Sequence, residues 1–262
     1  ANRDGPDMAI SVELVTSVEG FERLRSEWNG LVDAMQFPEI FYRWEWSFLY
    51  FRHCRFGDEL YIVLARDATD GRIVALAPLC LRRTRSLGIS VTVAETIVAG
   101  LADYQHFLVW AGVHRGRAVT AILDFLAARA DRWDVLDLRQ FCSRDPTTFQ
   151  IINAAQARHD WTVRTHIETQ VAVRDLRPGR ATEDGARLRR IRTRLEALQA
   201  RGFEVRVGSR DFDTLWPAVR DLHVRTWPDS PLGPEKDGQL FDALVASEGM
   251  RHHVDLSVVT GA

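Results

Sequence analysis

The sequence predicts a mixed α/β fold, in which a central sheet is flanked by helices and the last third of the chain begins a second unit. Short apolar stretches of strand length alternate with longer stretches that repeat apolar residues at helical spacing. An Asp-Gly pair at residues 70–71 separates two apolar stretches, as in a β-hairpin. Residues 105–138 follow the order strand, turn, helix, strand, which joins two parallel strands of one sheet.

The elements of the first unit are justified one by one from apolar spacing and from capping residues. In chain order they are a strand at 10–15, helices at 19–35 and 38–53, strands at 60–65, 72–81, 91–98 and 105–111, a helix at 119–130, a strand at 133–138, a helix from 146, and a strand at 161–173. Ser17 caps the first helix, and Asp145 with Pro146 opens the last one. The aromatic residues of 38–53 are typical of a core. Pro78 requires an edge strand or a bulge.

A candidate anion site lies where the strand at 105–111 leads into the helix at 119–130. The connecting turn contains Arg115, Gly116, Arg117 and Ala118. Backbone N–H groups at a glycine-containing turn can hold an anion, because a helix start carries about half a positive charge. The alternative is that Gly116 only ends a loop and the arginines are solvated.

This arrangement resembles the acyl-CoA-binding core of GNAT-fold acetyltransferases, in which an Arg/Gln-x-x-Gly-x-Gly/Ala turn holds the CoA pyrophosphate. Gly116 and Ala118 match the last two fixed positions, whereas Val113 stands where the motif has Arg or Gln. The resemblance implies a GNAT-like mixed sheet and acetyl-CoA as co-substrate. It also implies that residues 115–118 bind that cofactor.

Further motifs are spread over most of the chain. They are Trp28, FYRWEW at 41–46, GRIVALAPL at 71–79, Asp103-Tyr104, WDVLDL at 133–138, Arg189-Arg190 and LHVRTW at 222–227. Together they resemble the CelD-like subgroup of GNAT-type proteins, which is associated with cellulose and exopolysaccharide biosynthesis. The resemblance implies acetyl transfer to an amine or hydroxyl of a saccharide or cell-envelope precursor.

Candidate catalytic residues cluster just before the strand at 105–111. Acyl transfer needs a base, a donor to the developing oxyanion and a proton source for the thiolate. Asp103, Tyr104 and His106 offer a carboxylate, a phenol and an imidazole, and the last two share one face of an extended chain. The alternative is that Asp103 caps the loop while the two rings pack under the sheet edge.

Composition excludes several classes of protein. The chain has 262 residues, 46% of them hydrophobic, and a formal charge of −2, which is typical of a globular protein. Its longest apolar run, residues 73–81, is shorter than the roughly 20 residues of a membrane span, and no signal peptide opens it, so we expect a cytoplasmic protein. Cys54, Cys80 and Cys142 are widely spaced, which suggests neither disulfides nor a metal site.

The chain divides, on this reading, into a GNAT-like domain at 8–175, a polar linker at 176–183 and a partial second GNAT-like domain at 184–262. The second domain is predicted to contain, in chain order, a helix at 184–200, a strand at 203–207, helices at 212–226 and 240–247, and a strand at 254–259. We expect it to be truncated, because no central strand or phosphate turn follows. Its oligomeric state is not predicted.

Candidate substrate-binding residues lie in this second part. The helix that carries Arg189 and Arg190 is strongly basic; it forms a solvated face, or it binds CoA phosphates, an anionic saccharide or RNA. His223, Arg225 and Trp227 line an interdomain cleft, or Leu222 and Trp227 anchor this helix to the core. DNA is not expected, and RNA is the least supported partner, because no RNA-binding motif accompanies the arginines.

Three functions therefore stay open. The first is an acyl-CoA-dependent N- or O-acyltransferase. The second is a catalytically inactive GNAT-derived binding or scaffold protein of polysaccharide assembly, which Val113 favours. The third is aminoacyl transfer from charged tRNA, as in Fem-type enzymes, with the basic helix as the RNA contact.

Overall fold

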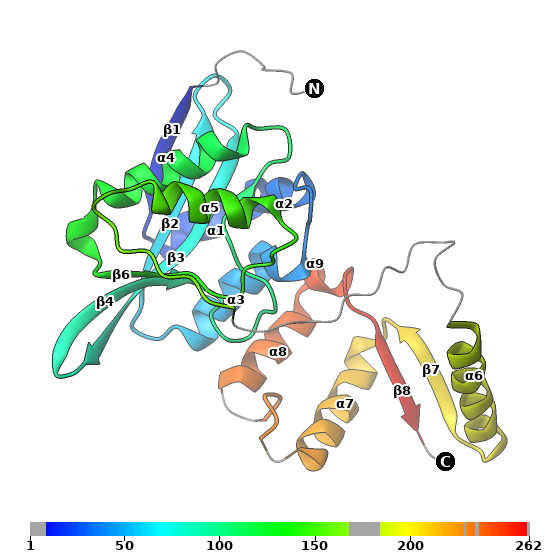
Figure 1. Ribbon diagram of the computed structural model, residues 1–262. Helices are drawn as coiled ribbons and strands as arrows, with labels where there is room; N and C mark the ends of the chain where they lie inside the picture. The colour runs from blue at the N-terminus through cyan, green and yellow to red at the C-terminus, as the bar shows by residue number, and fades with distance from the viewer. Residues whose placement is uncertain (1–8, 168–183, 228, 234–235, 261–262) are drawn as a thin grey trace. The chain divides into compact units, whose positions relative to one another are not determined.

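The structure is a computed structural model that describes residues 9–167, 184–227, 229–233 and 236–260 (Figure 1). Contacts divide the chain into unit 1, Ala1–Glu168, and unit 2, Thr169–Ala262, and each unit is described by itself. The linker expected at 176–183 lies outside the described residues.

Unit 1 contains a six-stranded mixed sheet with the strand order β1-β2-β3-β4-β6, in which β5 also pairs with β3. The strands are β1 (Ile10–Val15), β2 (Glu59–Asp67), β3 (Ile73–Ser86), β4 (Ile89–Thr96), β5 (Leu108–Val109) and β6 (Val135–Asp137). Every pairing is antiparallel except that of β4 with β6, which is parallel. The predicted hairpin of β2 and β3 is confirmed.

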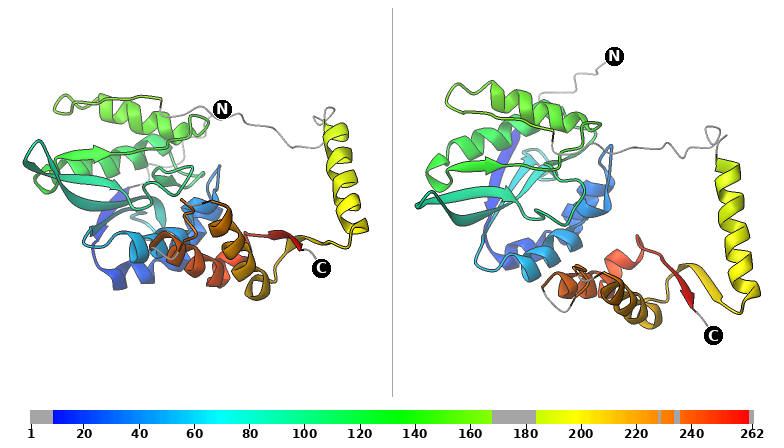
Figure 2. Two further views of the ribbon diagram at one scale, coloured as in Figure 1. Left: turned by 90° about the horizontal axis from the view of Figure 1, so that it is seen from below. Right: turned by 60° about the horizontal axis from the view of Figure 1, so that its bottom comes forward.

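Helices cover both faces of this sheet, as Figures 1 and 2 show. One face carries α4 (Arg115–Ala127) with α5 (Pro146–Gln156) beside it, and the other carries α1 (Val18–Arg23), α2 (Arg25–Asp33) and α3 (Trp44–Cys54). Two short 3₁₀ turns, η1 (Ile40–Tyr42) and η2 (Ala130–Arg132), complete the unit. The expected fold class, a mixed sheet flanked by helices, is confirmed.

Capping residues fix where these helices begin. The Ser17 side chain accepts a hydrogen bond from the Gly20 N–H at the start of α1, and Asp145 accepts one from the Thr147 N–H at the start of α5. The single helix predicted at 19–35 is two helices, because the chain turns at Leu24.

The core lies on both sides of the sheet. On the α4 side, Val119, Ile122, Leu123 and Leu126 are fully buried against the strands, each stabilising the fold by about 1.5–3 kcal/mol. On the other side the aromatic-rich segment packs inward, and its buried members are Tyr42, Trp44, Trp46 and Tyr50. The interpretation of this segment as core is thereby confirmed.

Three expectations are wrong in detail. The strand predicted at 105–111 is only β5, and β6 pairs with β4 rather than with it, although β5 lies in the same sheet. The turn predicted at 115–118 is the first turn of α4. Residues 161–167 form no strand, and the rest of the strand predicted at 161–173 lies outside the described residues.

Unit 2 contains a two-stranded antiparallel sheet and four helices among its described residues. In chain order the elements are α6 (Asp184–Ala200), β7 (Glu204–Ser209), α7 (Phe212–Thr226), α8 (Lys236–Ala246), α9 (Glu248–Arg251) and β8 (Leu256–Thr260). Phe212, Leu215 and Leu256 form a small core, in accord with the predicted helix at 212–226. None of the helices in the described part of the chain combines the length and apolar character that crossing a membrane requires.

Candidate functional site

The central feature of unit 1 is a strand that is broken by a loop. On the same side of β3, Leu79 pairs with Thr96 of β4 and Leu76 pairs with Leu108 of β5. Between these two pairs, β3 spans three residues, from 79 back to 76, whereas the opposing chain spans twelve, from 96 to 108. A regular ladder would need three residues on both strands, so the opposing chain contains nine additional residues. β4 and β5 are thus two halves of one strand position, and the loop 97–107 leaves the sheet between them.

Pro78 lies opposite the point at which β4 ends. The Ile97 N–H donates to the Pro78 carbonyl at 2.8 Å, and in a regular ladder residue 78 would donate in return to the Ile97 carbonyl. Proline has no N–H, so this second bond cannot form. Pro78 does not lie on an edge strand, the first of the two predicted alternatives, because β3 lies inside the sheet. Its missing donor instead coincides with the strand break.

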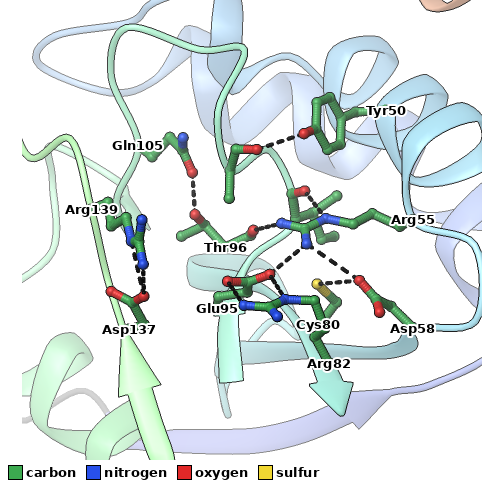
Figure 3. Close-up of polar contacts among 12 residues, drawn as sticks. Tyr50, Arg55, Asp58, Cys80, Arg82, Glu95, Thr96, Gln105, Asp137 and Arg139 are labelled. Carbon is green, nitrogen blue, oxygen red and sulfur yellow. Dashed lines mark hydrogen bonds and ion pairs between the residues drawn. The ribbon is translucent and has the colours of Figure 1, made fainter. Parts of the chain in front are cut away.

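Side chains at the end of α3 satisfy the carbonyls that the broken ladder leaves free (Figure 3). Arg55 donates from Nε to the Ile97 carbonyl at 2.8 Å and from Nη2 to the Thr96 carbonyl at 2.9 Å. The Tyr50 hydroxyl donates to the Ala99 carbonyl at 2.5 Å. Buried carbonyls are costly when unpaired, so these bonds hold the first part of the loop in place.

The same guanidinium group joins a buried ion network. Arg55 lies 2.5 Å from Glu95 and 3.3 Å from Asp58, and Arg82 binds both oxygens of Glu95 (Figure 3). Burial raises the pKa of Glu95, but the hydrogen bonds from Arg82 and Arg55 outweigh it and the pKa is lowered.

Asp58, Cys80 and Glu95 could in principle bind a metal ion, since their ligand atoms lie within 4.8 Å of one another. Without a metal, burial raises the pKa of the Cys80 thiol to about 12, so this group is neutral in the cluster. The Arg55 and Arg82 guanidinium groups already supply the positive charge. The cluster is therefore a structural ion network.

A second network ties the end of the loop to the chain after β6. The Thr96 hydroxyl donates to Gln105 Oε1 (Figure 3). Gln105 Nε2 donates to Gln140 Oε1 at 2.6 Å. The Gln105 N–H also donates to the Gln140 carbonyl at 3.2 Å. Gln140 has a φ of 56°, a strained value for a residue other than glycine. Both ends of the loop are therefore fixed.

The three residues predicted to be catalytic differ in how deeply they are buried. Asp103 is exposed, Tyr104 is half-buried and His106 is buried. His106 Nδ1 lies 2.5 Å from the Phe107 carbonyl, which only accepts, so Nδ1 carries a proton. Its Nε2 lies 3.1 Å from Asp145 Oδ2, an ion-pair distance without the alignment of a hydrogen bond. His106 therefore serves the packing of the loop in this structure.

Asp145 is thus more than the cap of α5. Burial raises the pKa of its carboxyl, but His106 and the Thr147 N–H outweigh that effect and bring the pKa to about 2. The sequence indicated only the cap, because nothing local connects residues 39 positions apart.

Glu39 is a candidate that the sequence did not reveal. Burial and the Asp103 carboxylate raise its pKa, while His106 opposes them. The pKa of Tyr42 is raised as well, first by burial and then by Asp145 and Glu39, and its ring lies 4.9 Å from that of His106. A carboxyl group with a raised pKa beside a second carboxyl group is suited to general acid–base chemistry.

A small cavity lies beside these groups. Its volume is about 20 Å³, enough for a single water. Among the residues that line it are Tyr42, Pro78, Thr96, Tyr104 and His106. The cavity therefore opens between η1 and the broken strand.

The candidate cofactor site differs from the expected turn. His114 caps α4, and its Nδ1 accepts from the Arg117 N–H at 3.4 Å. Ala118 is fully buried, so only Arg115, Gly116 and Arg117 can face an anion. A Cβ added to Gly116 would lie 3.1 Å from Gln150 Oε1 of α5, so a larger residue there must displace that side chain.

Two neighbours explain the departures from the expected motif. Val113 is partly buried against the core, a position that an Arg or Gln side chain would not fill. Arg115 donates from Nη2 to Gln36 at 2.9 Å, which fixes its guanidinium next to the start of α4. Two arginines at the N-terminus of this 13-residue helix are compatible with binding of a phosphate group.

In unit 2, the structure brings together His223 of α7 and Trp227, the residue that follows this helix. Their rings lie 4.4 Å apart, His223 Nδ1 lies 2.7 Å from Ser230 Oγ, and a hollow of about 260 Å³ is lined by these three residues with Asp229 and Pro231. Arg225 does not line it and instead pairs with Asp221 at 2.6 Å. On α6, Arg189 and Arg190 are exposed.

Comparisons with known proteins give the following results. No protein-family model matches the chain, and no curated protein matches it. Among solved structures, it is similar to a ribosomal-protein-alanine N-acetyltransferase from Brucella melitensis biovar Abortus 2308, with 19% identity, 61% of this chain and 99% of that chain covered, and a TM-score of 0.34. It is also similar to a GNAT family acetyltransferase from Staphylococcus aureus (12%, 63% and 100%, TM-score 0.36). An aminoglycoside acetyltransferase from an uncultured soil metagenomic sample gives similar values (16%, 63% and 100%, TM-score 0.36).

Proposed function

We propose that unit 1 is a GNAT-like domain that transfers an acetyl group from acetyl-CoA to an amine or hydroxyl group. The observation that carries the proposal is the broken strand, whose loop presents Asp103 and Tyr104 beside Glu39. The half-strand β5 then leads within a few residues to the N-terminus of α4. One continuous segment thus bears Asp103, Tyr104 and a helix start that suits an anion, and Glu39 comes from the chain before η1.

Each group has a role that its surroundings favour. Glu39 is the base, because its raised pKa brings its proton affinity nearer to that needed at neutral pH. The Asp103 carboxylate contributes to that raised pKa, and Tyr104 is the proton source for the leaving thiolate. Arg115, Gly116 and Arg117 would hold the diphosphate of acetyl-CoA, with Ala118 supporting them from the core.

The acceptor is proposed to be a saccharide or cell-envelope precursor, as the sequence resemblance implies. His223 and Trp227 support this, because an aromatic ring beside polar groups can bind a sugar ring. Arg189, Arg190 and Arg225 stay proposed substrate contacts on the surface of unit 2.

A catalytically inactive scaffold is the second candidate. Two observations favour it: Val113 fills the core where the motif has Arg or Gln, and His106 is buried in contact with Asp145. In that case unit 1 would keep the fold and bind partners without transferring an acyl group.

Thiol release from acetyl-CoA, measured with a panel of amino sugars and sugars, tests the proposal. Replacing the base should lower kcat/KM by about 100-fold or more, so Glu39→Gln is the informative variant. Glu22→Gln, an exposed change on α1, is the matched control and should leave the rate unchanged. Activity that survives Glu39→Gln would contradict the assigned base.

Cofactor binding is tested separately by thermal shift. Wild type should show a modest rise in Tm with millimolar acetyl-CoA, because a ligand of the folded state stabilises it. Gly116→Val should abolish that rise, and circular dichroism should show unchanged helix content. If wild type shows neither the rise nor thiol release, the scaffold is the better explanation.

A further inference from the structure

The β3–β4 hairpin continues past the rest of the sheet. Pairing of β2 with β3 reaches only as far as Leu81, and β6 pairs with β4 only at Val93–Glu95. Within the described residues, 83–91 therefore form a two-stranded ribbon with no third strand beside it, and Figure 1 shows it projecting from the sheet. We refer to residues 82–92 as the arm.

The arm has two different faces. Residues that pair directly across an antiparallel ladder share a face. Ile89 and Val91 pair with Ser86 and Thr84, which makes one face mainly β-branched and apolar. Arg83 and Arg85 pair with Thr92 and Ser90, which makes the other face cationic. The arm is therefore amphipathic.

The residues at the tip of the arm do not favour the stability of the folded chain. Leu87 and Gly88 connect the strands with φ values of 52° and 83°, the left-handed pair of a two-residue turn that favours Asn-Gly. Leu87 is 100% exposed, and Ile89 next to it is 68% exposed. A leucine there has the wrong backbone preference and contacts nothing in the fold, so its presence indicates an external contact.

Charge indicates what that contact is. Residues 82–94 include three arginines and no acidic residue, although the whole chain has a formal charge of −2. Arg82 is bound to Glu95. Arg83 and Arg85 are exposed, and neither forms an ion pair with another residue in the described part of the chain. Asp134 accepts from the Thr92 N–H at the base of the arm.

We propose that the arm docks unit 1 on an anionic lipid surface. Leu87 and Ile89 would enter the boundary between headgroups and acyl chains, which an apolar face penetrates by about 5–10 Å. At about 3.3 Å per residue, Arg85 and Arg83 would then lie about 7 and 13 Å behind the tip, near the lipid phosphates. A second copy of the chain is disfavoured as the occupant, because two arms would bring four arginines together.

The test is sedimentation of the full chain with vesicles. Wild type should bind vesicles that mix phosphatidylcholine with phosphatidylglycerol, bind pure phosphatidylcholine vesicles much less, and lose binding as salt rises. Leu87→Asn should lower the partition coefficient about tenfold and leave Tm unchanged or higher, because asparagine suits the left-handed turn. A double Arg83→Gln, Arg85→Gln variant should lower it by a similar factor.

Phe149→Asn is the matched control, since Phe149 is a 52% exposed apolar residue on α5. It should bind as wild type does. The proposal is overturned if wild type ignores anionic vesicles, if it binds both vesicle types equally, or if Leu87→Asn binds as wild type does. A wild-type dimer that Leu87→Asn dissociates, without lipid binding, would assign the arm to contact between copies instead.

Discussion

Removal of the Arg55 guanidinium should destabilise unit 1 far more than removal of an exposed arginine. Arg55 is 9% exposed and donates to two carboxylates and two carbonyls. Arg55→Met would leave the carbonyls of Thr96 and Ile97 without this donor. Of the two arginines that bind Glu95, only Arg82 would remain. The methionine keeps much of the apolar stem, so the change tests mainly the charge and the hydrogen bonds.

The expected cost is about 4 kcal/mol. Removing one partner of a buried ion pair costs about 3–5 kcal/mol, and part of this cost arises because the other partner stays buried and unpaired. The ring of Tyr50, whose centroid lies 5.6 Å from the guanidinium carbon, loses a cation–π contact as well. With a urea dependence of about 2 kcal/mol per molar, the midpoint should fall by about 2 M.

Urea unfolding followed by tryptophan fluorescence measures this cost, because six of the eight tryptophans lie in unit 1. The control is Arg132→Met, which removes an ion pair with Glu59 whose side chains are 46% and 44% exposed. Such a pair contributes less than about 1 kcal/mol. Equal midpoint shifts for the two variants would refute the reasoning, since burial would then not distinguish them.

Two further predictions concern buried titratable groups. The pKa of Asp145 is depressed from 3.8 to about 2, so its ionised carboxylate contributes about 2 kcal/mol to the free energy of unfolding. This contribution is present above pH 4 and is lost as the pH falls through 2. Asp145→Asn should therefore remove this pH dependence of stability from acid unfolding curves. Burial raises the pKa of Cys80 to about 12, so native protein at pH 8 should show slow alkylation there by mass spectrometry, while the half-buried Cys54 and Cys142 react first. Rapid labelling of Cys80, or an unchanged acid slope in the Asp145 variant, would count against these assignments.

Local signals in the sequence predicted most elements. The helix expected at 212–226 has those bounds in the structure, and the Asp-Gly turn and the Asp145 cap lie where expected. Such features depend on residues within one turn of each other, so a single sequence contains them.

Long-range features could not be predicted in the same way. Residues 105–107 belong to the predicted strand and are buried, but Gln105 bonds to Gln140 and His106 lies beside Asp145 instead of continuing the ladder. Glu39 has a raised pKa first because it is partly buried and then because Asp103 lies near it, in a loop more than 60 positions away. Pro78 is the exception, because a proline in a strand predicts an edge or a bulge, and the ladder breaks beside it.

Pro78 also has an evolutionary consequence. The ladder stops opposite this residue and resumes at Leu108, so the chain between can change length without altering the register of either half of the strand. Doubling the length of a flexible loop costs only about 0.6 kcal/mol, which a domain of this size tolerates. Insertions near Gly100 could therefore diversify what the loop recognises while the sheet stays as it is.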